Sequence, residues 1–146
     1  MRSNLFSIIV YGEPIPQGSK SVTKTGRMYE ANKKLDPWRK KIAKEASDVM
    51  EAVGHEPMIG PCKINLNFYF PRPKSHSNAL GVIKASAPEY KQSKPDLDKL
   101  IRAVGDALTG IVVKDDSQFV QIEAAKFYTG QDRQPAGVSI LIRELP

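Results

Sequence analysis

The most informative segment of the chain reads Lys94-Pro-Asp-Leu-Asp-Lys-Leu-Ile-Arg-Ala-Val-Gly-Asp-Ala-Leu-Thr-Gly-Ile-Val-Val-Lys-Asp-Asp-Ser-Gln118. Its apolar residues recur at the i, i+3, i+4 and i+7 positions that are typical of an amphipathic helix. We therefore predict a helix from about Pro95 to Leu108, with Gly110 as its C-terminal stop. The predicted apolar stripe consists of Leu97, Leu100, Ile101, Val104, Ala107 and Leu108.

On either side of this segment, the sequence predicts strands and one further helix. Residues 62–70 alternate between apolar and polar side chains, as a strand with one buried face does. Asp36 and Pro37 mark the cap and first position of a helix that we expect to end near Val53, before Gly54. Further strands are predicted at 5–11, 117–128 and 138–142, with a short extra strand at 27–29.

This order of elements predicts an α+β (mixed α/β) fold, in which a small mixed β-sheet is covered by two main helices. With 146 residues, the chain is expected to form a single domain, 1–146. Its longest apolar runs are too short to cross a membrane, and no signal region is evident at the N-terminus. We therefore expect a cytoplasmic protein.

Cysteine and histidine are scarce, which argues against several kinds of site. Cys62 is the only cysteine, and its place on the apolar side of a predicted strand favours a small buried hydrophobe over a reactive thiol. His55 and His76 are the only histidines. This excludes a structural zinc site and disfavours a Ser-His-Asp or Cys-His catalytic arrangement.

The net positive charge comes from two predicted loops. The chain has 22 Lys and Arg residues against 16 Asp and Glu, a net charge of +6. Segments 14–34 and 71–94 together carry ten basic and two acidic residues, whereas the remainder carries 12 basic and 14 acidic residues. Positive charge confined to loops favours a polyanionic partner. The length of the irregular segment 71–94 indicates either a functional loop or a disordered surface loop.

Four carboxylates flank the predicted helix: Asp96 and Asp98 at its start, and Asp115 and Asp116 beyond its end. Phosphodiester hydrolysis requires an activated water and neutralisation of phosphate charge, and carboxylates that hold Mg²⁺ meet both needs. On a regular helix, Asp96 and Asp98 would diverge by about 200°. Both can face one ion only if Asp96 lies at or before the cap, in extended backbone. Each pair also has a structural interpretation, in helix capping or in a turn.

Six short motifs follow one another along most of the chain in a specific order and spacing. They are Gly12-x-Pro14-x-Pro16, Pro95-Asp-Leu-Asp98, Leu100 with Arg102, Asp106-Ala-Leu-Thr-Gly110, Asp115-Asp-Ser-Gln118 and Lys126-Phe-Tyr. An isolated Asp-x-Asp would indicate little. In this combination, the motifs resemble the RusA family of Holliday junction resolvases, which are crossover junction endodeoxyribonucleases.

The resemblance implies a RusA-like homodimer that acts in DNA recombination and repair. It would bind four-way (Holliday) junctions and make paired symmetric cuts with Mg²⁺ as cofactor, for which Mn²⁺ substitutes. The implied metal ligands are Asp96, Asp98 and one or both of Asp115 and Asp116, with Asp116 favoured. Arg102 stands where the family has a lysine; it can contact a phosphate but cannot donate a proton. The expected catalytic residues are Asp96, Asp98, Asp116 and Arg102.

The remaining expectations concern location, DNA contacts and an alternative function. The protein is expected to be associated with the nucleoid and to be encoded by a bacterium or a phage. An alternative of another class is a protein that binds branched DNA without cutting it, which metal-dependent cleavage of a synthetic junction would distinguish. DNA contacts are expected from Lys20, Lys24, Arg27, Arg72, Lys74, Lys94 and Lys126.

Overall fold

The structure is a computed structural model, which describes residues 4–18, 20–26, 28–30, 32–130 and 135–146. One sheet has the strand order β1-β6-β4-β5. β4 and β5 are parallel and the other neighbours are antiparallel, so the sheet is mixed, as predicted. The four strands are β1 (Leu5–Tyr11), β4 (Cys62–Phe70), β5 (Phe119–Tyr128) and β6 (Gly137–Glu144).

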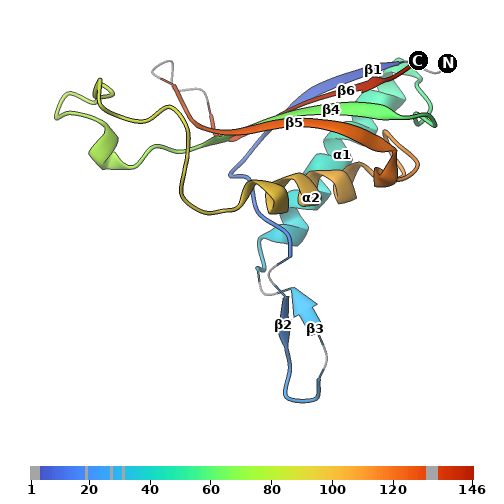
Figure 1. Cartoon of the computed structure of the whole chain (residues 1–146), viewed down its shortest axis with the longest axis horizontal. Coiled ribbons are helices and arrows are strands. Elements are labelled where there is room, and N and C mark those ends of the chain that lie inside the picture. The colour runs from blue at the N-terminus through green and yellow to red at the C-terminus, as the bar shows by residue number, and fades with distance from the viewer. Residues whose placement is uncertain (1–3, 19, 27, 31, 131–134) are drawn as a thin grey trace.

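Helices α1 (Leu35–Val53) and α2 (Leu97–Leu108) pack on the same face of this sheet (Figure 1). This confirms the predicted α+β fold with two covering helices. The core lies between the helices and the apolar side of β4, where Cys62 is buried as expected. The alternation in β4 directs five side chains into this core: Cys62, Ile64, Leu66, Phe68 and Phe70.

The start of α1 differs from the prediction, whereas its end agrees. Lys34 occupies the N-cap position without a side-chain capping hydrogen bond, and Asp36 lies in the first turn. The Asp36 carboxylate pairs with Lys40 Nζ at 2.9 Å, which is possible because residues four apart share one helix face. Hydrogen bonding to Lys40 lowers the pKa of Asp36. At the other end, Gly54 adopts the left-handed conformation, with φ 67°, that terminates many helices.

The opposite face of the sheet carries no helix in the described part of the chain (Figure 1). Leu5, Ile9 and Tyr11 of β1 are 45%, 50% and 47% exposed. At the far edge of the sheet, β5 exposes Val120 and Ile122 to a similar degree. The protein therefore keeps substantial apolar surface outside the core that the helices cover.

A two-stranded hairpin, β2 (Lys20–Val22) and β3 (Met28–Glu30), projects away from the sheet and helices (Figure 1). The sequence predicted a short strand at 27–29 but not its partner. A three-residue strand is too short to show a clear alternation of apolar and polar residues. The turn between the strands exposes Lys24. The hairpin therefore carries part of the first basic loop well away from the body of the protein.

Replacing Gly137 with Ala is expected to destabilise the sheet by about 1–3 kcal/mol, the usual range for overpacking. Gly137 is buried between Tyr11 of β1 and Tyr69 of β4, and a Cβ atom there would lie only 2.4 Å from the Val10 carbonyl oxygen. That obstacle is backbone, so it cannot rotate away. Urea unfolding measures the change in the free energy of unfolding.

The matched control for this substitution is Gly105→Ala. Gly105 is buried in α2, and a Cβ atom at this position would meet its nearest neighbour, Asp116 Cβ, at an ordinary contact distance of 3.8 Å. Since Ala favours a helix interior by about 0.8–1 kcal/mol over Gly, this variant should be as stable as the wild type or more so. Equal stability of Gly137→Ala and Gly105→Ala would contradict the close approach of β1 and β6.

Candidate active site

The N-terminus of α2 positions the first pair of predicted carboxylates. Asp96 is the N-cap residue and has extended backbone, with φ −68° and ψ 139°, and Asp98 lies in the first turn. The backbone condition that the sequence set for these two side chains is therefore met. Asp98 Oδ1 accepts a hydrogen bond from the Lys99 backbone N–H at 2.9 Å, and Asp96 pairs with Lys99 Nζ at 3.8 Å. Both carboxylates remain exposed.

The second pair lies where a short 3₁₀ helix, η2 (Asp116–Gln118), leads into β5. Asp115 is its N-cap residue and takes part in a capping box with Gln118. Its carboxylate accepts a hydrogen bond from Ser117 Oγ at 2.5 Å, and this bond lowers the pKa of Asp115. The Asp115 backbone N–H in turn donates to Gln118 Oε1 at 2.9 Å. Asp115 therefore has a defined structural role in this turn.

Asp116 faces α2 instead. It lies over Gly105, and its carboxylate interacts with that of Asp106 on the same helix. Partial burial raises the pKa of Asp116, and the neighbouring charges of Asp115 and Asp106 raise it further. Negative charge is thus crowded at this point, which favours the binding of a cation.

Asp106 is a candidate site residue that the sequence-based prediction did not name, although it lies in one of the quoted motifs. Its four-residue spacing from Arg102, and that of Arg102 from Asp98, places all three on one side of α2. That spacing was visible in the sequence. The proximity of Asp116 to Asp106 was not visible in the sequence, because it depends on how the turn after α2 returns to the helix.

The predicted carboxylates form two groups along α2, with Asp96 and Asp98 at its start and Asp116, beside Asp115, over Gly105. Gly105, beneath Asp116, is seven residues after Asp98, or about 10 Å along the helix axis. In the described ranges, no three or more His, Cys, Asp or Glu side chains are close enough to hold a metal ion. A site built on these residues therefore needs ligands from outside the chain.

Mg²⁺ fits such a site. It prefers oxygen ligands, and it is commonly held by one or two carboxylates while waters and substrate phosphates complete its shell. All the candidate donors here are carboxylate oxygens. The crowding of Asp106, Asp115 and Asp116 is also the kind of repulsion that a divalent cation relieves. The donor chemistry thus agrees with the predicted cofactor without requiring a closed cage.

The segment before the hairpin is fastened to the same side of α2. The Gln17 backbone N–H donates to the Lys99 carbonyl at 3.0 Å, and the Gln17 side-chain amide donates to Asp106. Arg39 of α1 donates to Gln17 Oε1 at 3.1 Å. A Cβ atom on Gly18 would lie 3.2 Å from Arg102 Nη1, so the chain passes closely over the arginine. The base of the hairpin is therefore tied to the acidic side of α2.

The predicted DNA-binding residues occupy different environments. Lys24, Lys74 and Lys94 are exposed. Lys126 is partly buried, and its Nζ donates to the carbonyls of Ser93 and Pro95 at 2.8 Å each. Burial, with the nearby charge of Lys91, lowers the pKa of Lys126. Lys126 thus holds the segment that leads into Asp96. Arg27 and the side chain of Lys20 lie outside the described part of the structure.

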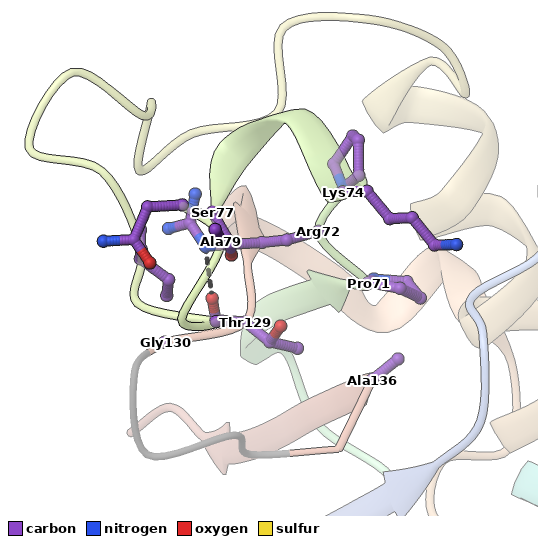
Figure 2. A pocket seen from close by; sticks show the side chains of 12 residues that line it. Pro71, Arg72, Lys74, Ser77, Ala79, Thr129, Gly130 and Ala136 are labelled. Atoms are coloured by element: carbon purple, nitrogen blue, oxygen red, sulfur yellow. Dashed lines mark hydrogen bonds between the residues drawn. The ribbon is translucent and has the colours of Figure 1, made fainter.

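Arg72 lines an open pocket of about 840 Å³ between the 71–83 segment and the end of β5 (Figure 2). Its guanidinium donates to the carbonyls of Thr129 and Pro88, both at 2.7 Å, and lies 5.4 Å from the centre of the Tyr128 ring. Arg72 therefore fixes the long loop to the sheet. The Lys74 side chain points away from this guanidinium (Figure 2).

A small mixed sheet that supports an acidic helix face, with basic segments around it, defines an α+β protein with an acidic candidate site. The chain belongs to the RusA family, since the model of that family, "Endodeoxyribonuclease RusA", matches residues 11–142. An uncharacterised protein of Bacillus subtilis (strain 168), YqaN, is 32% identical over 142 residues, which cover 93% of this chain and 94% of the relative. Family membership supports endodeoxyribonuclease activity on DNA junctions. Among the described residues, no helix is long and apolar enough to span a membrane.

Proposed function

We propose that the protein is a Mg²⁺-dependent endodeoxyribonuclease that resolves four-way DNA junctions by paired symmetric cuts during recombination and repair. The observation that carries this proposal is the family match over residues 11–142. The two carboxylate groups along α2 also support the proposal. Asp96, Asp98 and Asp116 all lie within the residues that the family model matches. The exposed basic residues around them suit a polyanionic substrate.

In this proposal, the metal ligands would be Asp96 and Asp98 at the start of α2 and Asp116 further along it, with waters and substrate phosphates completing the coordination. Asp115 shapes the turn that presents Asp116. When bound, Mg²⁺ supplies charge neutralisation at the phosphate and lowers the pKa of an attacking water. Arg102 is exposed between the two carboxylate groups and contacts a phosphate oxygen. It acts only through its charge and its N–H donors, because its guanidinium does not lose a proton near neutral pH.

The direct test is to incubate the purified protein with a mobile four-way junction and Mg²⁺, and to map the cuts on each labelled strand. We expect nicks at symmetric positions on two opposing strands, no cutting with EDTA, and restored cutting when Mn²⁺ replaces Mg²⁺. Tight binding with no cutting in either metal would favour the alternative, a protein that binds branched DNA without cleaving it.

Binding should depend strongly on salt, and the hairpin should supply part of this dependence. Changing Lys20, Lys24 and Arg27 together to Ala is expected to reduce the slope of log affinity against log salt by about 2–3 units, at roughly 0.9 for each phosphate that the variant no longer neutralises. The control changes Lys40, Lys44 and Lys63 to Ala, since each of these lysines is paired with a carboxylate. Equal slopes for the two variants would place the hairpin away from the DNA backbone.

The protein is expected to be a symmetric dimer in solution. A four-way junction has two equivalent strands to cut, so a two-fold axis gives one acidic site to each. Association would also cover apolar side chains that the described chain leaves exposed, such as Leu5, Ile9 and Tyr11. Sedimentation equilibrium at micromolar concentration should give twice the mass of one chain. A monomer that makes unlinked single nicks would contradict paired resolution.

A further inference from the structure

A groove leads to Asp96 from segments that lie far apart in the sequence. One pocket, of about 280 Å³, is lined by the Glu13–Pro16 segment, Lys34, Phe70 and the segment around Lys91 and Lys94. A second pocket, of about 310 Å³, is lined by five residues: Pro16, Lys94, Pro95, Asp96 and Lys99. The two pockets share Pro16, Lys94 and Pro95. The two pockets are therefore neighbours, and the second one reaches Asp96, the first carboxylate of α2. The two pockets together are called the groove below.

The groove has an excess of positive charge. Its lining includes four lysines and two carboxylates, which leaves a net charge of +2. Only Lys99 pairs with one of these acids, Asp96, at 3.8 Å. Among the ion pairs of the described residues, none involves Lys34, Lys91 or Lys94. Three lysines thus line the groove without an ion pair among the described residues.

Lys91 is held in position, unlike most surface lysines. Its Nζ lies 5.4 Å from the centre of the Phe70 ring and 5.3 Å from that of Tyr128, within the range of a cation–π contact. The same ammonium donates to Ser93 Oγ at 3.0 Å, and it has two further N–H groups. Its backbone N–H also bonds to the Lys126 carbonyl at 3.0 Å.

We propose that this groove is a phosphate-binding site that holds the DNA backbone next to the phosphodiester cleaved at α2. The inference rests on the proposed nuclease function and extends it to Lys34 and Lys91. The ligand class is a backbone phosphodiester because the groove offers ammonium donors between proline walls. Its one aromatic ring, Phe70, is 2% exposed and so offers no platform for stacking a base. Such a contact positions the strand without reading its sequence.

The first experiment measures binding without cutting. A fluorescent four-way junction is titrated in EDTA over a range of salt concentrations with the wild type and with a Lys34→Gln, Lys91→Gln, Lys94→Gln triple variant. We expect the slope of log affinity against log salt to fall by about 2–3 units, at roughly 0.9 per phosphate. The Lys40, Lys44, Lys63 variant removes the same charge and should keep the wild-type slope. Equal slopes for both variants would overturn the proposal.

The second experiment locates the phosphates. Uncharged methylphosphonate linkages are placed one at a time on either side of the cut in the synthetic junction. At two or three neighbouring positions, each replacement should weaken binding by the wild type but not further weaken binding by the triple variant, since that variant lacks the ammonium groups that bind these phosphates. Additive losses at every position would overturn the proposal. If the triple variant does not fold, a double variant of the exposed Lys34 and Lys94 replaces it in both experiments. The double variant should show about two thirds of the slope change expected for the triple variant.

These results separate the inference from the proposed function. If the wild type binds but does not cut the junction in Mg²⁺ or Mn²⁺, the nuclease proposal fails, whatever the slopes are. If the wild type cuts and the triple variant binds with an unchanged slope and cuts equally fast, the groove proposal fails alone. If the wild type cuts and the variant loses both slope and the methylphosphonate effect, both proposals are supported.

Discussion

Replacing Asp98 with Asn is expected to slow junction cleavage roughly 100- to 1,000-fold. Rates commonly fall by this factor when one group that stabilises the transition state electrostatically is removed. Binding of the junction should stay equal or become tighter, because the substitution removes a negative charge that repels phosphate. The fold should be little affected. Asp98 is exposed, and Asn keeps the oxygen that accepts the hydrogen bond from the Lys99 backbone N–H.

Rates are measured with excess enzyme on a labelled junction, so that binding and cutting are separated. The control is Asp48→Asn, which removes the same charge from an exposed aspartate of α1 that pairs with Lys44 at 3.0 Å. This variant should cut at the wild-type rate. Wild-type cutting by Asp98→Asn would remove that residue from the metal site. A loss of both binding and cutting would instead indicate a damaged fold, which the melting temperature would reveal.

The elements that the sequence predicted well are those whose burial pattern is long enough to be read. Nine alternating residues define β4, and the apolar stripe of α2 extends over three turns. The extended backbone at Asp96 also followed from local chemistry, because Pro95 precedes it and the apolar stripe begins at Leu97. The fold class could be predicted because both helices have one apolar side and β4 alternates.

What could not be predicted depends on contacts between distant segments. β6 pairs with both β1 and β4, and neither partner is next to it in the chain. Likewise, Lys34 and Lys91 come from two different loops and line one pocket together with the Glu13–Pro16 segment. Charge counts identified both loops as basic, but they carry no information about which lysines face each other.

Asp115 and Asp116 illustrate both what the sequence could predict and what it left open. The sequence placed Asp115 and Asp116 beyond α2 but left open which of them binds metal. The structure separates them: Asp115 accepts a hydrogen bond from Ser117 within its own turn, whereas Asp116 lies against α2 and interacts with Asp106. The difference arises from the 3₁₀ turn at 116–118, which sends adjacent side chains in different directions.

The same substitution at these neighbouring positions is therefore expected to have very different effects. Asp116→Asn should lower cleavage roughly 100-fold or more, because it removes the negative charge of a carboxylate that is proposed to bind the metal. Asp115→Asn should change cleavage less than about threefold, equivalent to about 0.65 kcal/mol. Asn caps a helical turn about as well as Asp does, and its amide oxygen can still accept the hydrogen bond from Ser117.

A second measurement tests metal binding without DNA. Mg²⁺ that binds only the folded protein raises the melting temperature, by mass action. The rise should be present in the wild type and in Asp115→Asn, and it should be reduced in Asp116→Asn, whose crowded carboxylates have lost one charge. If Asp115→Asn instead loses both cleavage and the Mg²⁺-dependent rise while Asp116→Asn keeps them, Asp115 is the ligand. The η2 turn would then have to open for the metal, because the Asp115 carboxylate is engaged by Ser117.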